Sequence, residues 1–144
     1  MKILLSSLLS ILFLFSCDQQ LNQVVKTYEN GQKWSEGNFK DGKVDGSFTF
    51  WYENGQKSYE ENYRDGIRVG KWIGWYENGK KSSEKHYKNN KRDGKWTSWY
   101  DNGQKSSERF YNNDKVKGIE NYWYKNGQKY RELTYIDNKL ISEK

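Results

Sequence analysis

Few side chains in this sequence have the type and spacing that catalytic chemistry would need. His86 is the single histidine, and five glutamates recur at a constant step of 24 residues: Glu36, Glu60, Glu84, Glu108 and Glu132. A histidine can act as a general base, and paired carboxylates can act as acid and base in glycoside hydrolysis. Either kind of site needs a group of residues that occurs once in the chain.

Neither pattern supports catalysis. The residues that stand at the position of His86 in the other copies are Asn38, Asn62, Phe110 and Thr134. Glutamates on every second strand of a sheet would lie about 10 Å apart, which exceeds the roughly 6.5–9.5 Å of an inverting glycosidase. A cross-strand ladder of ion pairs explains them better, with partners in a matching lysine series: Lys33, Lys57, Lys81, Lys105 and Lys129. We predict that the chain is not an enzyme.

The composition also argues against metal, cofactor and nucleic-acid sites. Residues 41–46 contain two acids and a lysine, without the dense acidic pattern of a calcium loop. One cysteine and one histidine are too few for a zinc site. The lysines alternate with glutamates and form no basic stripe, so we predict no nucleic-acid partner, no metal and no cofactor.

One repeated motif supplies the elements that position these residues. Residues 75–81, Trp-Tyr-Glu-Asn-Gly-Lys-Lys, recur as near copies at residues 27–33, 51–57, 99–105 and 123–129, which indicates a repeat protein. Asn-Gly in this setting is a strong hairpin signal, because glycine takes positive φ without steric cost. We assign a structural role to the turn glycines Gly31, Gly55, Gly79, Gly103 and Gly127.

Each unit therefore contains two strands joined by a tight turn, and polar turns rich in Gly, Asn and Asp join successive units. We predict an all-β fold, an elongated open antiparallel β-meander of 24-residue two-strand repeats, with about five hairpin units and roughly ten strands. The core should be a thin layer shared between neighbouring units.

Two registers are compatible with the hairpin. A two-residue Asn-Gly loop pairs Trp75 with Ser82, whereas a three-residue Glu-Asn-Gly loop with a bulge pairs Trp75 with Lys81. We favour the second, because it places Ile73, Trp75 and Tyr87 on one side of the sheet. A slip of one residue would reverse the two faces.

The first residues have the form of a secretory signal: a charged start, an apolar run from Ile3 to Phe15 and then Ser16-Cys17. The run is too short to span a bilayer, which needs about 20 residues. Residues 14–17, Leu-Phe-Ser-Cys, resemble the bacterial lipoprotein signal, which implies lipidation at Cys17. An ordinary signal peptide is the alternative. Removing residues 1–16 removes one charge, that of Lys2, so the formal net charge changes from +6 to +5.

The repeat itself, Gly-x-Trp-x-x-Trp-Tyr-x-Asn-Gly-x-Lys followed by Glu and Tyr, resembles the variant MORN repeat of bacteria. The resemblance implies an elongated antiparallel sheet used for binding, and it brings no catalytic residue. Some members are described as antitoxin-like, and MORN proteins more widely are associated with membrane surfaces and scaffolding. The expected organisation is a removed signal peptide at 1–16, a lipidated cysteine with a short tether at 17–26, and the repeat domain at 27–144.

We expect an envelope-anchored bacterial lipoprotein, with the choice between inner and outer membrane left open, that binds a protein partner. Two alternatives use the same surface, namely an antitoxin or immunity protein that neutralises a toxin and a protein that binds cell-wall glycan. Hot spots are enriched in Trp and Tyr, so the predicted partner-binding residues are Tyr52, Trp72, Tyr76, Trp96 and Tyr100.

Overall fold

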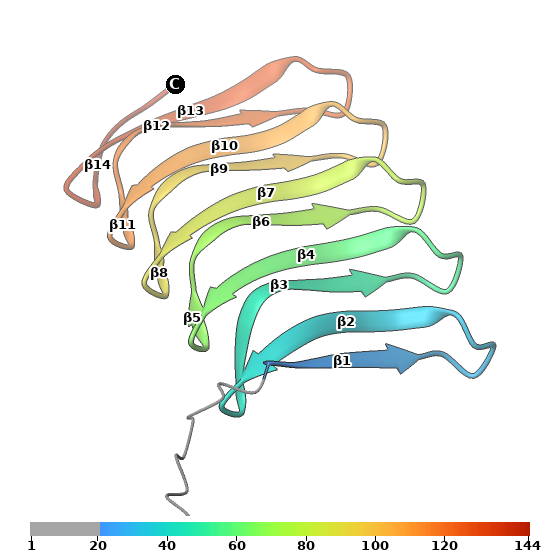
Figure 1. Cartoon of the computed structure of the whole chain (residues 1–144). Helices are drawn as coiled ribbons and strands as arrows, with labels where there is room; N and C mark the ends of the chain where they lie inside the picture. The colour runs from blue at the N-terminus through green and yellow to red at the C-terminus, as the bar shows by residue number, and fades with distance from the viewer. Residues whose placement is uncertain (1–20) are drawn as a thin grey trace, which may run out of the picture.

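The structure is a computed structural model that describes residues 21–144 (Figure 1). This part of the chain forms one open antiparallel sheet of 14 strands. Eleven of them follow the spatial order β1-β2-β3-β4-β6-β7-β9-β10-β12-β13-β14, and the short strands β5, β8 and β11 pair with β4, β7 and β10. The strands are β1 (Leu21–Thr27), β2 (Lys33–Lys40), β3 (Lys43–Trp51), β4 (Lys57–Arg64), β5 (Ile67–Arg68), β6 (Gly70–Trp75), β7 (Lys81–Lys88), β8 (Lys91–Arg92), β9 (Gly94–Trp99), β10 (Lys105–Asn112), β11 (Lys115–Val116), β12 (Gly118–Trp123), β13 (Lys129–Ile136) and β14 (Lys139–Glu143). The predicted all-β meander is confirmed.

Two boundaries differ from the prediction. Strand β1 begins at Leu21 and pairs with β2 as far as Thr27, so the second half of the segment 17–26 predicted as a tether is a strand. The inter-unit turns also contain short strands, β5, β8 and β11, of two residues each. These raise the strand number above the ten predicted. Periodic local signals do not reveal them, because they form only where the polar turn pairs with the preceding strand.

The Glu-Asn-Gly turns have the predicted three-residue geometry. The Tyr76 N–H donates to the Lys80 carbonyl at 2.8 Å, and the Gly79 N–H donates to the Tyr76 carbonyl at 2.9 Å. Gly79 has a φ of +79°. The side-chain Oδ1 of Asn78 accepts a hydrogen bond from the Lys80 N–H at 3.0 Å. Trp75 pairs with Lys81, as we favoured.

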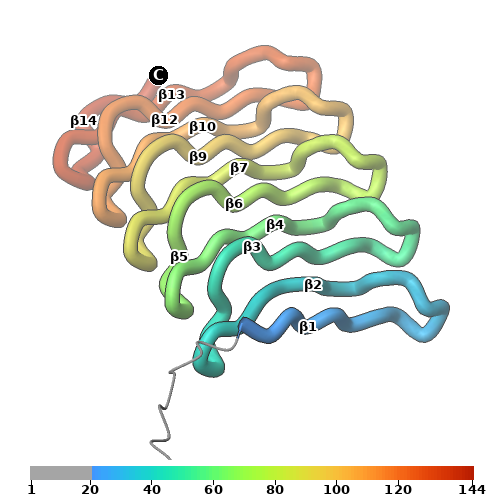
Figure 2. The backbone as a smooth tube through the Cα atoms, in the orientation of Figure 1, coloured from blue at the N-terminus to red at the C-terminus, as the bar shows by residue number. Residues whose placement is uncertain are grey.

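The opposite end of each hairpin uses a two-residue turn in which both residues have positive φ, for example Asn89 at 51° and Asn90 at 66°. This is the type I′ geometry that matches the right-handed twist of paired strands. A glycine with positive φ then follows each short strand, such as Gly70 at 63° and Gly94 at 96°. Figure 2 shows the resulting shape, a stack of hairpins that each bend toward the two-residue turn.

The predicted grouping of Ile73, Trp75 and Tyr87 on one side is wrong. The register shifts beside Trp75, because Trp75 pairs with Lys81 while Gly74 pairs with Ser83. Ser82 is therefore the extra residue of a second bulge, which moves all later residues of β7 to the opposite face. Tyr87 lies on the face of Trp72, with ring centroids 5.0 Å apart, and Trp75 lies on the other face.

We name the two sides by their contents. The aromatic face carries Trp72, Trp96 and the tyrosines that pack on them, whereas the lysine–glutamate face carries the Trp75 series and the repeated Lys and Glu residues. The core is thin: Tyr111 and Leu133 are the large hydrophobic side chains buried within residues 21–144. Inter-unit hydrogen bonds supplement it, as where the Tyr76 hydroxyl donates to the Trp99 carbonyl at 2.7 Å.

Candidate functional site

A ladder of interlocking rings crosses the aromatic face. Its ring centroids are separated by 5.0–5.2 Å, within the range at which aromatic pairs stabilise beyond simple burial. The ladder runs in the order Tyr63, Trp72, Tyr87, Trp96 and Tyr111. Each tryptophan also donates its indole N–H to a backbone carbonyl, Trp72 to Asn62 at 3.1 Å and Trp96 to His86 at 3.0 Å. The ladder therefore forms a wall in which packing and hydrogen bonds together fix the orientation of the tryptophan rings.

Beside this wall lies a row of small residues that we call the serine trough. Cross-strand pairing places Gly74, Ser83, Ser98 and Ser107 directly opposite one another on four neighbouring strands. The row continues into aromatic residues at both ends, Tyr59 next to Gly74 and Tyr122 next to Ser107. Small side chains between large ones leave a hollow across the centre of the sheet.

Two depressions occupy this hollow. One has a volume of about 140 Å³ and is lined by Tyr59, Glu61, Trp72, Ser83 and Lys85, among others. The second has a volume of about 200 Å³ and is lined by Lys85, Trp96, Ser98, Ser107 and Arg109, among others. Lys85 borders both, so it marks the midpoint of the trough.

The charged groups on this face differ from unit to unit. Glu61 accepts the Tyr63 hydroxyl at 2.8 Å, and burial together with this bond raises the pKa of Tyr63. Arg109 pairs with Glu120, which is only 4% exposed. Lys85 Nζ lies 5.3 Å from the Trp96 ring centroid, with no described carboxylate at ion-pair distance.

Glu120 ends the ring ladder, because it stands where the earlier units have Trp72 and Trp96. Its carboxylate also accepts the Tyr122 hydroxyl. Burial and this hydrogen bond raise the pKa of Tyr122 to about 12. In this unit, Glu120 with its partners Arg109 and Tyr122 thus replaces the tryptophan of the earlier units.

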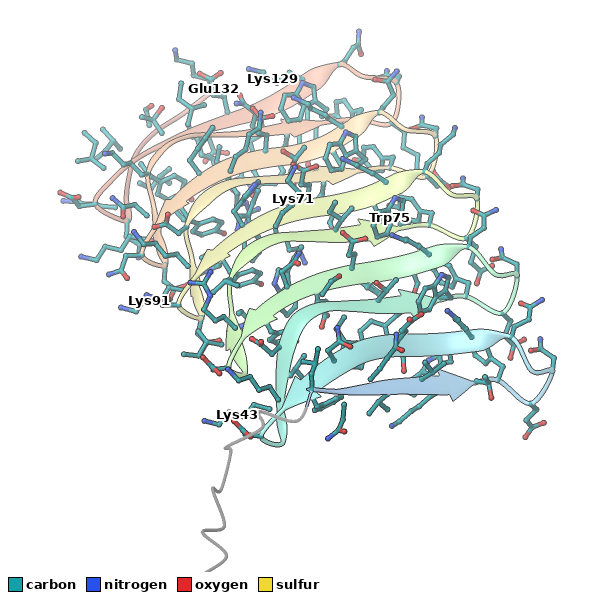
Figure 3. The ribbon with its side chains drawn as sticks, in the orientation of Figure 1. Lys43, Lys71, Trp75, Lys91, Lys129 and Glu132 are labelled. Carbon is teal, nitrogen blue, oxygen red and sulfur yellow. The ribbon has the colours of Figure 1, made fainter. Side chains whose placement is uncertain are left out.

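The lysine–glutamate face repeats almost without change. Within each unit a lysine and a glutamate three residues apart form an ion pair of 2.6–3.0 Å. Figure 3 labels one such pair, Lys129 and Glu132. The predicted cross-strand ladder between these two series is corrected here: both partners belong to one strand, because the bulge brings them to the same face. Each lysine from Lys33 to Lys105 also lies 5.6–5.9 Å from a tryptophan of the next unit.

Five segments of the chain match the family model described as a MORN repeat variant, at residues 27–41, 44–65, 68–89, 92–113 and 116–137. The chain belongs to this family. No curated protein matches it. MORN repeats indicate a repeat-based binding or scaffold module, and the aromatic face is where the units of this one differ most.

Two of the five predicted partner-binding residues, Trp72 and Trp96, form the ladder on the aromatic face. The other three are tyrosines that directly follow a strand, as Tyr76 follows the end of β6 at Trp75. Tyr52, Tyr76 and Tyr100 each donate their hydroxyl to a backbone carbonyl of the next unit at 2.7–2.8 Å. Burial and the nearby Tyr59 raise the pKa of Tyr52. These tyrosines therefore stabilise the stack of units.

Sequence reasoning missed the serine trough, Tyr59 and Lys85. A signal was present in the alignment of units, because Ser83 and Ser107 stand where another unit has Tyr59, and Gly74 and Ser98 stand where others have Phe50 and Tyr122. Departures from the consensus, more than the consensus itself, identify the hollow.

The remaining chemical candidates have modest surroundings. His86 is half-buried, with its Nδ1 2.9 Å from the Lys95 carbonyl oxygen. Residues 21–144 contain no cluster of three or more His, Cys, Asp or Glu side chains suited to a metal ion, and no helix long and apolar enough to cross a membrane. Cys17 and the predicted signal peptide lie outside the described residues.

Proposed function

We propose that this MORN-variant chain is a non-catalytic binding protein, anchored by lipid in the bacterial envelope, that holds its partner on the aromatic face. The observation that supports this is the contrast in how the two faces use their polar groups. The lysines and glutamates of one face satisfy each other. The other face presents a hollow bordered by aromatic rings and by the Lys85 ammonium, which has no carboxylate partner among residues 21–144.

The anchoring part rests on Leu14-Phe15-Ser16-Cys17, which resembles a lipoprotein signal. Strand β1 begins four residues after Cys17, so a lipid on that cysteine would hold the sheet close to the membrane. We expect Cys17→Ser to release the protein into the soluble fraction and to abolish incorporation of labelled fatty acid. Retention of the variant in the membrane pellet, with no label in the wild-type protein, would contradict the proposal.

The binding part can be tested by photo-crosslinking in cells from two matched positions. Tyr59 is 51% exposed on the aromatic face, and Lys71 is exposed on the lysine–glutamate face. A photoreactive phenylalanine at position 59 should give a defined adduct that is absent when the same residue stands at 71. Adducts that form only from position 71 would contradict the proposal, because the partner would then lie on the lysine–glutamate face.

Contributions to the partner's affinity should be distributed over the units. We expect Tyr76→Ala and Tyr100→Ala each to weaken binding by about 1–2 kcal/mol and to add in the double variant. Tyr76→Phe keeps the ring and removes only the hydroxyl bond to Trp99, so it controls for loss of stability. If the adduct is a toxin, inhibition of that toxin by the wild-type chain distinguishes an immunity role from scaffolding.

A further inference from the structure

The shape of the serine trough limits what can occupy it. Neighbouring strands are about 4.8 Å apart, so the three serines in a row extend about 10 Å across the strands. Gly74 at one end is buried, and Tyr59 and Ser83 close the space above it. Tyr59 and Tyr122 border its two ends, and Trp72 and Trp96 form one long side. The occupant must be narrow, extended and compatible with rings at intervals.

The floor of the trough offers hydroxyl groups and no backbone hydrogen bonds. β6, β7, β9 and β10 are interior strands whose main-chain groups pair with strands on both sides. An added peptide strand therefore has no free edge to extend here. A sugar chain needs no such edge, because its hydroxyls bond to serine and its C–H faces pack on aromatic rings.

The charge at the midpoint selects among sugars. Lys85 borders both depressions, and its ammonium has no acidic partner within the described part of the chain. The side chains at the same position in the adjacent units, Glu61 and Arg109, are already engaged with Tyr63 and Glu120. A carboxylate on the ligand would accept a charge-assisted hydrogen bond from the Lys85 ammonium group.

We propose that the serine trough binds an extended acidic glycan, with a sugar carboxylate at Lys85 and neutral sugar rings over Ser83 and Ser98 toward the aromatic ends. This inference rests on the proposed function, since it names the class of ligand for the same face.

The repeat supplies its own folding-compatible variants for the test. Lys85→Glu and Lys85→Arg copy the residues that adjacent units carry at this position, Glu61 and Arg109. Ser98→Tyr copies Tyr122 and fills the trough. Lys88→Glu, exposed at the end of β7, is the matched charge control. Circular dichroism and thermal unfolding of each variant confirm the fold.

The probes are an array of uronate-containing oligosaccharides, the same oligosaccharides with carboxylates reduced to alcohols, and poly-glutamate. We expect the wild type to bind uronate-containing sugars, Lys85→Glu to weaken binding about tenfold or more, as for loss of a charged hydrogen bond, and Ser98→Tyr to abolish it. Lys85→Arg and Lys88→Glu should bind normally.

Three outcomes overturn the inference: no binding to any acidic sugar, equal binding to the reduced sugars, or tighter binding to poly-glutamate. The crosslinking contrast between positions 59 and 71 does not depend on the sugar. If position 59 gives adducts but no acidic sugar binds, the acidic-glycan inference is wrong and the proposed function stands. If positions 59 and 71 give the same adducts, the proposal that the aromatic face binds the partner is wrong.

Discussion

The two faces of this sheet differ in how regularly their residues repeat from unit to unit. On the lysine–glutamate face, each unit repeats the same lysine, glutamate and tryptophan arrangement with little change. On the aromatic face, the ladder position changes from Trp96 to Glu120, and the trough position changes from Ser98 to Tyr122. Uniform contacts suit a surface that joins identical units, whereas unit-specific contacts suit a surface that distinguishes one ligand from another.

The difference also extends to burial. Glu120 is 4% exposed in its pair with Arg109, whereas the side chains of Lys81 and Glu84 are 46% and 22% exposed. Solvent screens exposed pairs, so these contribute little each. A buried carboxylate depends much more on its partner, because an unpaired charge is costly to bury. The aromatic face should therefore be the more sensitive of the two to single substitutions.

The largest effect is expected at the buried pair. Arg109→Leu leaves the Glu120 carboxylate without its cation and should lower the free energy of unfolding by about 3–5 kcal/mol. The matched change on the other face, Lys105→Leu, should cost less than about 1 kcal/mol. Urea denaturation of both variants measures the difference. Equal costs would remove the distinction between the faces.

A smaller loss is expected from the ring ladder. Trp96→Ala removes stacking on Tyr87 and Tyr111 and the hydrogen bond to the His86 carbonyl. Because Trp96 is half-buried, we expect about 2–3 kcal/mol, below the range for fully buried aromatics. Trp96→Phe, which keeps a ring, should recover more than half of the loss in the same denaturation assay. No recovery would mean that the indole N–H, and not packing, holds the ladder.

The smallest effect concerns pH on the lysine–glutamate face. The hydrogen bond from Lys81, with further help from Lys71, lowers the pKa of Glu84. A lowered folded-state pKa adds stability that is present above the unfolded value, about 4.3, and is lost as pH falls through the folded value. Glu84→Gln should therefore flatten the decline of melting temperature below about pH 4.5. An unchanged acid slope in the variant would show that Glu84 has no part in it.

The sequence by itself determined the repeat and the family. A strict 24-residue period, Asn-Gly turns and alternating aromatics are local signals that fix the position of each hairpin. They left two registers open, and the structure selects the one that pairs Trp75 with Lys81. The same pattern predicts that Tyr52, Trp72, Tyr76, Trp96 and Tyr100 bind the partner, which stays a prediction; in the structure Trp72 and Trp96 belong to the ring ladder, and the three tyrosines bond to the next unit.

Only the tertiary structure decided which residues share the aromatic face and where it is hollow. The second bulge at Ser82 reverses the alternation along β7, and the dipeptide Ser82-Ser83 contains no local signal for which residue is the extra one. The serine trough likewise exists only because four strands align Gly74, Ser83, Ser98 and Ser107 in one register. Strand register depends on packing between units. Only the three-dimensional structure therefore shows that these four residues are neighbours.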